Sequence, residues 1–370
     1  MDYFQLKNGV MHAENVPLTR IAEEVGTPVY VYSRATLERH AQVFREGIAP
    51  VGRSHIAFAI KANPNRAVLR VLAKQGYGAD VVSGGEISRA ISAGMKPEDV
   101  VFSGVGKTRA ELEQALDVGI GQFNIELEEE GIVLAEIAAS KGKRAAATLR
   151  VNPDVDAGTH AKISTGKKEN KFGVAIDLAP GIFDRLAKLP GLDMKGVALH
   201  IGSQLFDLDP LEAAYRRVGQ LVAELRGMGH AIERVDLGGG LGVPYKPSEN
   251  PPSPADYGQM VARATKGWDV TLMFEPGRVI VGNAGVLLTK VIWVKPGVIN
   301  PYVIVDAAMN DLARPAMYDA WHDFAAVRPT GEKMVANIAG PVCESGDTFA
   351  MGRQIIGRDL VDLAAHGEGV

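Results

Sequence analysis

From Val29 onward the chain alternates short strand-like apolar runs with segments of helical periodicity, at a steady spacing. This alternation is typical of repeated βα units and therefore of a parallel sheet. Eight units can be counted, and eight parallel strands are the number that closes a barrel, so we predict an α/β fold with a (β/α)8 TIM-like barrel. The expected strands cover residues 55–60, 78–82, 99–103, 122–125, 146–151, 194–201, 233–237 and 270–274. The expected helices cover residues 66–74, 85–93, 108–118, 127–140, 179–188, 210–226 and 254–265.

The segments on either side of the barrel do not follow this rhythm. Residues 1–30 and the region after Gly277 carry β-branched runs separated by turn residues, at 286–294, 303–306 and 335–339. We assign both flanks to one β-rich domain. The predicted domains are therefore residues 1–30 with 276–370, which are β-rich, and residues 31–275, which form the barrel. The proline-rich segment 245–257 is expected to be a surface loop.

Composition narrows the classes of function. Apolar residues make up 46% and charged residues 23% of the chain, and the net charge of −4 gives no reason to expect nucleic acid or an anionic membrane as a partner. The first residues lack the basic and apolar regions of a signal peptide, and no apolar run in the sequence reaches the length of a membrane span. The single cysteine, Cys343, excludes an intrachain disulfide and fits a reducing compartment. We therefore expect a cytoplasmic protein.

A lysine ends the first expected strand. In SHIAFAIKANPN the apolar run 56–60 is followed by Lys61 and then by an Asn-Pro turn. This places Lys61 at the carboxyl end of the sheet, where barrel enzymes carry their active sites. The alternative is a solvated loop lysine, since lysine is rarely buried without a partner.

Polar or glycine-rich clusters follow nearly all the other expected strands. They are SGGE at 83–86, SGVGK at 103–107, NP at 152–153, HIGSQ at 200–204, GGG at 238–240 and EPGR at 275–278. Because the carboxyl ends of the strands meet at one rim of a barrel, these groups are expected to face one another. This distribution favours the functional interpretation of Lys61.

The glycine run offers a candidate phosphate site. Gly238, Gly239 and Gly240 present three consecutive backbone N–H groups without obstructing side chains, and the loops after strands seven and eight are the usual phosphate site of this fold. The alternative is a flexible turn with left-handed backbone. A dinucleotide-binding fingerprint is a weak match, because its third glycine is missing.

Three further residues allow both a functional and a structural interpretation. His200 ends an apolar strand and could contact a ligand or be a satisfied core histidine. Glu275 would be a carboxylate in apolar surroundings, which requires a cation or proton donor, and Arg278 could simply pair with it. Cys343, considered alone, is better explained as a small buried apolar residue.

A lysine, a phosphate cradle, a flat-ring partner and a carboxylate facing one site are the parts needed to hold pyridoxal phosphate. The lysine would form the Schiff base, and the carboxylate would keep the pyridine nitrogen protonated. Desolvation beside cationic neighbours would lower the pKa of Lys61 and make its amine nucleophilic.

The chain resembles a known family, the fold-type III, alanine-racemase-like pyridoxal-phosphate decarboxylases. The matching motifs extend over most of the chain and are AFAIKANPN, SGGE, FSGVGKT, RVNPDVDAGTHAKISTGKKENKFG, HIGSQ, GGGLGVPY, EPGR and CESGD. The resemblance implies that Lys61 carries the cofactor, that His200 stacks on its ring and that Glu275 contacts its pyridine nitrogen. It surrounds the cofactor phosphate with Ser203, Gly239, Gly240, Gly277 and Arg278.

The resemblance also indicates the reaction. Racemases of this fold place an arginine against the pyridine nitrogen, whereas a carboxylate such as Glu275 strengthens the electron sink and suits loss of CO2. Arg314, Tyr318 and Arg278 match the family's clamp on a distal carboxylate, and Glu344 matches the residue that holds the distal ammonium. The implied reaction converts meso-2,6-diaminopimelate to L-lysine and CO2. Carboxynorspermidine or another diamine acid stays open as the substrate.

The family further implies a homodimer with shared active sites. Cys343 and Glu344 would reach the partner's Lys61, and Cys343 would supply the proton that replaces CO2. One departure concerns the end of the chain, where the family continues with an Ala-Gly-Ala-Tyr motif whose tyrosine reaches the cofactor. Residues 357–370 read GRDLVDLAAHGEGV and lack that tyrosine, so we expect a C-terminally shortened member. A non-catalytic cofactor-binding protein is the alternative function.

Overall fold

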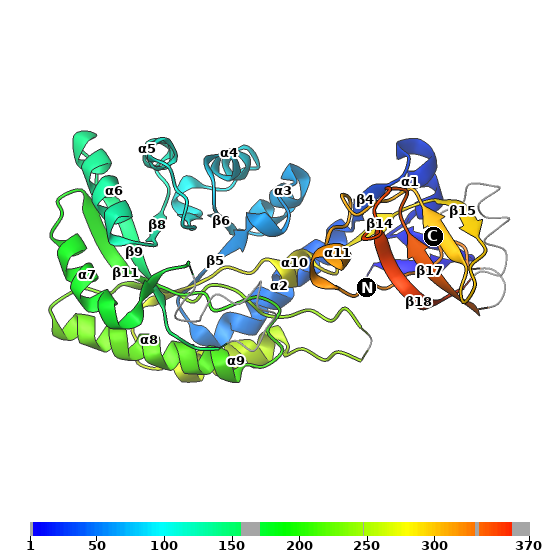
Figure 1. Cartoon of the computed structure of the whole chain (residues 1–370). Coiled ribbons are helices and arrows are strands. Elements are labelled where there is room, and N and C mark those ends of the chain that lie inside the picture. The colour runs from blue at the N-terminus through cyan, green and yellow to red at the C-terminus, as the bar shows by residue number, and fades with distance from the viewer. Residues whose placement is uncertain (1–2, 157–170, 247, 330–332, 357–370) are drawn as a thin grey trace. The chain divides into compact units, whose positions relative to one another are not determined.

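The computed structural model describes residues 3–156, 171–246, 248–329 and 333–356 of the 370-residue chain. It contains two compact units (Figure 1). One consists of residues 37–243 and 250–282, and the other of residues 1–36, 244–249 and 283–370. The predicted domain limits, 1–30 with 276–370 and 31–275, stay a prediction, and each unit is described below by itself.

The first unit is a closed barrel of eight parallel strands, as predicted. The strands are β5 (Ser54–Ala59), β6 (Gly78–Val81), β7 (Val100–Phe102), β8 (Gln122–Ile125), β9 (Ala145–Asn152), β11 (Leu192–Ala198), β12 (Arg234–Asp236) and β13 (Thr271–Phe274). Neighbours in this order pair in parallel, and β13 closes the barrel by pairing with β5. A two-residue strand, β10 (Val174–Ala175), pairs with the end of β9.

Helices lie outside these strands in Figure 1. They are α2 (Arg34–Ile48), α3 (Arg66–Lys74), α4 (Gly84–Ser92), α5 (Arg109–Val118), α6 (Glu128–Ser140), α7 (Ala179–Ala187), α8 (Asp209–Gly227), α9 (Pro254–Ala264) and the short α10 (Arg278–Val281). The seven predicted helices match α3 to α9 within a residue at each end. Side-chain caps set several starts: Ser83 begins α4, and capping boxes at Thr108 and Ser253 begin α5 and α9.

The strands are buried on both faces, which explains why they read as apolar runs rather than alternating ones. Ala57, Val101 and Met273 meet in one buried cluster. Phe102 and Phe123 are buried on neighbouring strands, with ring centroids 6.5 Å apart. Polar side chains interrupt the strands mainly toward their carboxyl ends, where the candidate site lies.

The second unit is rich in β structure, as predicted. Its strands are β1 (Phe4–Lys7), β2 (Val10–Ala13), β3 (Val16–Pro17), β4 (Val29–Tyr32), β14 (Gly285–Leu288), β15 (Val291–Lys295), β16 (Tyr302–Val305), β17 (Lys333–Ala339) and β18 (Thr348–Ile356), with helices α1 (Leu18–Val25) and α11 (Arg314–Tyr318). Strand β4 pairs antiparallel with β14, which joins the N-terminal segment to the C-terminal one. The expected run 286–294 divides at Thr289 into two strands that belong to different sheets.

A search of the helices in the described residues finds none whose length and hydropathy suit a membrane span.

Candidate active site

Lys61 lies at the carboxyl end of β5, in the single 3-10 turn Ile60–Ala62, so the strand ends one residue earlier than expected. Its Nζ donates a hydrogen bond to Oδ2 of Asp80, at the end of β6, over 2.9 Å. Asp80 is completely buried, whereas half of the Lys61 side chain remains accessible. Lys61 is therefore partly solvated, as the alternative expected, but it is also the counter-ion of a buried carboxylate, and its functional role stays a prediction.

The pKa of Lys61 is raised, contrary to the prediction. Burial is the largest single influence and acts to lower it, but the charges of Asp80 and Glu275 and the Asp80 hydrogen bond together outweigh burial. Arg150 acts in the same direction as burial. The prediction of a lowered pKa failed because it assumed cationic neighbours, whereas the charges that dominate around Lys61 are acidic.

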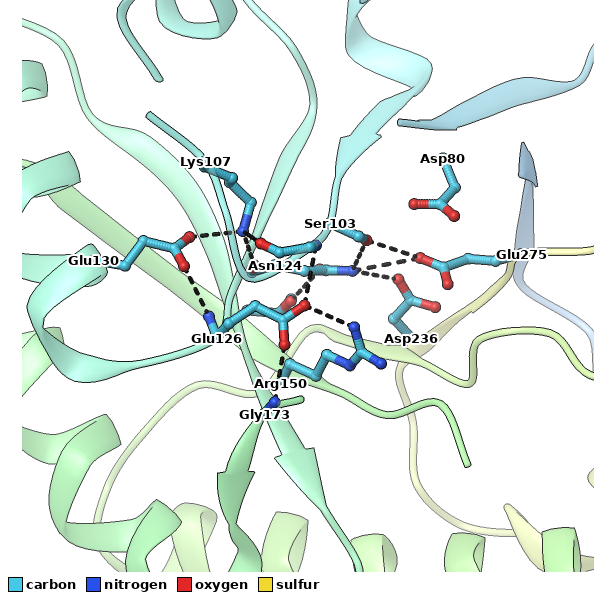
Figure 2. A network of polar contacts seen from close by, with 12 residues as sticks. Asp80, Ser103, Lys107, Asn124, Glu126, Glu130, Arg150, Gly173, Asp236 and Glu275 are labelled. Atoms are coloured by element: carbon cyan, nitrogen blue, oxygen red, sulfur yellow. Dashed lines mark hydrogen bonds and ion pairs between the residues drawn. The ribbon is translucent and has the colours of Figure 1, made fainter. Parts of the chain in front are cut away.

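Glu275, directly after β13, belongs to a buried polar cluster (Figure 2). Its Oε1 accepts hydrogen bonds from Ser103 Oγ at 3.3 Å and from Asn124 Nδ2 at 3.4 Å. Asn124 Nδ2 also donates to Asp236 Oδ2 at 3.1 Å. Burial raises the pKa of both Glu275 and Asp236, and the Asp236 charge raises that of Glu275 further. Residues within or directly after four strands, β7, β8, β12 and β13, therefore form one buried cluster that contains two carboxyl groups.

A second network continues from this cluster along β8 and β9 (Figure 2). Glu126 accepts hydrogen bonds from Arg150 Nη1 at 2.6 Å and from the Gly104 N–H at 3.0 Å. Lys107, whose side chain is completely buried, donates to Glu130 at 2.7 Å and to two backbone carbonyls at 2.8 Å. This network holds the loops after β7 and β8 and fixes the position of the Arg150 guanidinium.

His200 follows β11 and contacts the glycine run. The Gly239 N–H donates to His200 Nδ1 at 3.2 Å, so the ring accepts at this nitrogen. Burial lowers the pKa of His200 well below its usual value, and the charges of Lys61 and Arg150 lower it further. The ring is therefore neutral, which suits a stacking or hydrogen-bonding partner better than an ion-pair partner.

The glycine run differs from the expected row of three available amides. Gly238 donates its N–H to Asp236 Oδ1 at 3.0 Å, and Gly239 donates to His200, so two of the three amides already have protein acceptors. The run does require glycine. A Cβ on Gly239 would lie 2.2 Å from the Glu275 carbonyl oxygen, and Gly238 and Gly240 have φ values of +67° and +122°. The left-handed turn offered as the alternative is therefore present.

The other residues expected near a phosphate, Ser203, Gly277 and Arg278, also lie in the barrel unit. Ser203 is half-buried between β11 and α8. Gly277 precedes α10 and packs closely against β5, since a Cβ there would lie 3.1 Å from the Ala59 Cβ. Arg278 is the first residue of α10.

The remaining expected residues belong to the β-rich unit. The Arg314 guanidinium lies 4.7 Å from the centre of the Tyr245 ring, and Tyr318 ends α11. Cys343 and Glu344 are exposed, so the expectation that Cys343 is a small buried residue is wrong. The tyrosine motif expected near the end of the chain concerns residues outside the described ones.

Sequence reasoning missed Asp80, Asn124, Arg150 and Asp236. Each is a buried polar residue within a barrel strand, and this is the signal that could have found them, because an isolated polar residue in an apolar strand needs a partner. They provide the carboxylate beside Lys61 and the network around Glu275.

The barrel residues fit pyridoxal phosphate. Asp80 Oδ1 is buried without a hydrogen-bond partner among the described residues, which marks the rim beside Lys61 as able to accept a further donor. An amine, a neutral histidine ring, a buried carboxyl group and a glycine run meet at this end of the barrel, and they are the groups that the aldehyde, ring, ring nitrogen and phosphate of the cofactor require.

Comparisons with known proteins agree. Residues 34–282 match the family model described as pyridoxal-dependent decarboxylase, pyridoxal binding domain. The diaminopimelate decarboxylase of Zymomonas mobilis is 53% identical over 98% of this chain and 87% of its own length. The diaminopimelate decarboxylase structure from M. jannaschii superposes with a TM-score of 0.93 at 36% identity, covering 100% of this chain and 86% of that one. A Helicobacter pylori structure of diaminopimelate decarboxylase with L-lysine has a TM-score of 0.88 at 40% identity, covering 91% and 84%.

The barrel, the groups gathered at its rim and these similarities lead to one conclusion: the chain belongs to the pyridoxal-dependent decarboxylases.

Proposed function

We propose that this protein removes CO2 from meso-2,6-diaminopimelate and releases L-lysine. The observation that carries the proposal is the pairing of Lys61 with buried Asp80 at the same barrel rim as the buried carboxyl group of Glu275. Relatives that are 41–53% identical over at least 93% of the chain are named diaminopimelate decarboxylases. Similarity of this extent supports a shared substrate.

Lys61 is the residue we propose for attachment of pyridoxal phosphate. The cofactor supplies the electron sink that loss of CO2 from an amino acid requires. Asp80 orients the Lys61 amine and keeps it charged in the cofactor-free protein, as the raised pKa of Lys61 indicates. The amine must lose this proton to become a nucleophile, and the second Asp80 oxygen is the nearby acceptor without a partner among the described residues.

His200 is proposed to stack on the face of the cofactor ring, and Glu275 is proposed to contact its ring nitrogen. A neutral His200, held by the Gly239 N–H, presents a flat apolar face. Glu275 contacts the ring nitrogen, where a carboxylate supports a protonated ring and thus a strong electron sink. Ser203, Gly239, Gly240, Gly277 and Arg278 are proposed to surround the phosphate.

Arg314, Tyr318 and Glu344 of the β-rich unit, with Arg278 of the barrel unit, are proposed to recognise the distal end of the substrate. Arg314, Tyr318 and Arg278 would bind the distal carboxylate, a task that suits the forked guanidinium group. Glu344 would bind the distal ammonium. A decarboxylase for a diamino acid without a distal carboxylate, such as L-ornithine, would not need such an arginine.

We also propose a homodimer in which Cys343 and Glu344 complete the partner's site, with Cys343 as the proton donor. Support comes from their exposure on a well-fixed loop. Asp347 is buried and accepts hydrogen bonds from the Met309 N–H at 2.6 Å and the Val342 N–H at 2.8 Å, which anchors the loop. Mixing the inactive variants Lys61→Ala and Cys343→Ala should restore about a quarter of the activity through mixed dimers. No restoration of activity would exclude shared sites.

A cytoplasmic location also stays a proposal.

The decisive experiment measures CO2 release by the cofactor-loaded full chain from meso-2,6-diaminopimelate, L-lysine, L-ornithine and carboxynorspermidine. The proposal predicts that meso-2,6-diaminopimelate is the preferred substrate. The Arg314→Ala variant should lose most of this preference because its KM for meso-2,6-diaminopimelate increases. Cofactor binding without CO2 release from any of these compounds would identify a non-catalytic binding protein instead.

A further inference from the structure

Three buried carboxyl groups lie close together at the barrel rim (Figure 2). Asp80, Asp236 and Glu275 are 0%, 1% and 9% exposed. Lys61 hydrogen-bonds to Asp80, and the Arg150 guanidinium donates to Glu126. Asp236 and Glu275 thus share no adjacent cation in the contacts of the described residues, and two buried negative charges side by side would be costly. The pair is therefore expected to retain one proton.

The hydrogen bonds decide which of the two carries this proton. Asp236 accepts the Gly238 N–H at 3.0 Å and Asn124 Nδ2 at 3.1 Å, one on each carboxylate oxygen. From the donors among the described residues, Glu275 accepts longer bonds, at 3.3 Å and 3.4 Å, and both go to Oε1. Donors stabilise the charged form of the acid that accepts them, so Asp236 is the better anion and Glu275 the better proton carrier.

We propose that Asp236 and Asn124 are positioning residues, which keep one shared proton on Glu275 and so make Glu275 the donor that protonates the ring nitrogen of the cofactor. This inference rests on the proposed function. In the transfer, the O–H bond of Glu275 breaks, its electron pair stays on the carboxylate, and an N–H bond forms at the ring nitrogen. No electrons are exchanged with another group, and no further reactant is needed.

The charged groups facing Glu275 come from every neighbouring strand end. After burial, Asp236 on β12 and Asp80 on β6 are the charges that raise the pKa of Glu275, and Lys61 after β5 opposes them. Asp236 is the like charge with the larger influence, and it shares the Asn124 donor with Glu275. Once the ring nitrogen holds the proton, the Glu275 carboxylate gains a cationic partner, which favours the transfer.

The substitution Asp236→Asn tests this arrangement. The amide side chain would remove the like charge and could itself donate a hydrogen bond to Glu275, so Glu275 should ionise before the cofactor arrives. The ring nitrogen must then take its proton from solvent. The variant should bind the cofactor with uptake of up to one more proton than the wild type.

The uptake can be measured by calorimetric titration of the cofactor-free full chain with pyridoxal phosphate, in buffers of different ionisation enthalpy. The pH is set where the ring nitrogen of the free cofactor is unprotonated. We expect Asp236→Asn to take up more protons than the wild type, and Glu275→Gln and the exposed control Asp177→Asn to take up no more than the wild type. Equal uptake by Asp236→Asn and the wild type would overturn the inference. Failure of the wild type to bind pyridoxal phosphate at all would instead refute the proposed function.

An infrared measurement provides a second test that does not depend on the folding of Asp236→Asn. The cofactor-free wild type at neutral pH should show the C=O stretch of a protonated carboxyl group, and Glu275→Gln should lose that band. A wild-type spectrum without the band, or one that keeps it in Glu275→Gln, would contradict a proton on Glu275.

Discussion

Removing the Lys61 charge should destabilise the cofactor-free protein, because Asp80 would lose its counter-ion. The substitution Lys61→Met keeps the apolar stem and removes only the ammonium group. Breaking a fully buried ion pair costs about 3–5 kcal/mol of unfolding free energy. Asp80 is completely buried, but the Lys61 side chain is 52% exposed, so solvent screening reduces this figure. We expect a loss of about 2–3 kcal/mol for Lys61→Met after that discount.

A second substitution separates this charge effect from lost packing. Adding Asp80→Asn to Lys61→Met removes the uncompensated carboxylate and should restore most of the lost stability, a positive coupling in the double-mutant cycle. Urea unfolding at neutral pH measures the stability of the wild type, Lys61→Met, Asp80→Asn and the double variant. The exposed control Lys266→Met should leave the midpoint unchanged. Unaltered stability in Lys61→Met, or a further loss when Asp80→Asn is added, would refute the reasoning.

Three further predictions concern other parts of the barrel. The pKa of His200 is depressed in the folded protein, so the unfolded chain binds a proton at this residue more readily. The stability present above about pH 6.5 should therefore fall as the pH is lowered from there. The urea midpoint of His200→Gln should fall less steeply over that range than the wild-type midpoint, and an equal slope would contradict the prediction. Lys107→Met should lower the free energy of unfolding by about 3–5 kcal/mol in urea, because it leaves the buried Glu130 carboxylate without its cation. Lys141→Met, at a solvent-exposed ion pair, should lower it little. Equal losses would argue against the buried network. Gly239→Ala should weaken pyridoxal phosphate binding in fluorescence titration, since its Cβ would lie 2.2 Å from a backbone oxygen, while Gly227→Ala, with no atom within 4 Å of its Cβ, should bind normally.

The barrel could be predicted from sequence because both of its signals are local. Strands buried on two faces read as apolar runs, and the helices between them have caps and periodicity that neighbours in sequence define. The rim residues Lys61, His200 and Glu275 were also found, because polar residues that follow an apolar strand stand out.

The partners of these residues could not be predicted, because strand register and side-chain direction decide them. Asp80 lies beside Lys61 because Ala59 and Asp80 are paired across β5 and β6, although they are distant in the chain. Asp236 and Glu275 meet through Asn124, which is 112 and 151 residues away from them. The predicted decrease in the pKa of Lys61 was wrong for this reason, since its sign depends on Asp80.

The attachment of the cofactor to Lys61 is the central claim, and one measurement tests it directly. The protein loaded with pyridoxal phosphate is reduced with borohydride, digested and analysed by mass spectrometry. The account predicts a phosphopyridoxyl group on Lys61 and none in the Lys61→Ala variant. A stable adduct on another lysine, or an unmodified Lys61 in protein that has bound the cofactor, would contradict it.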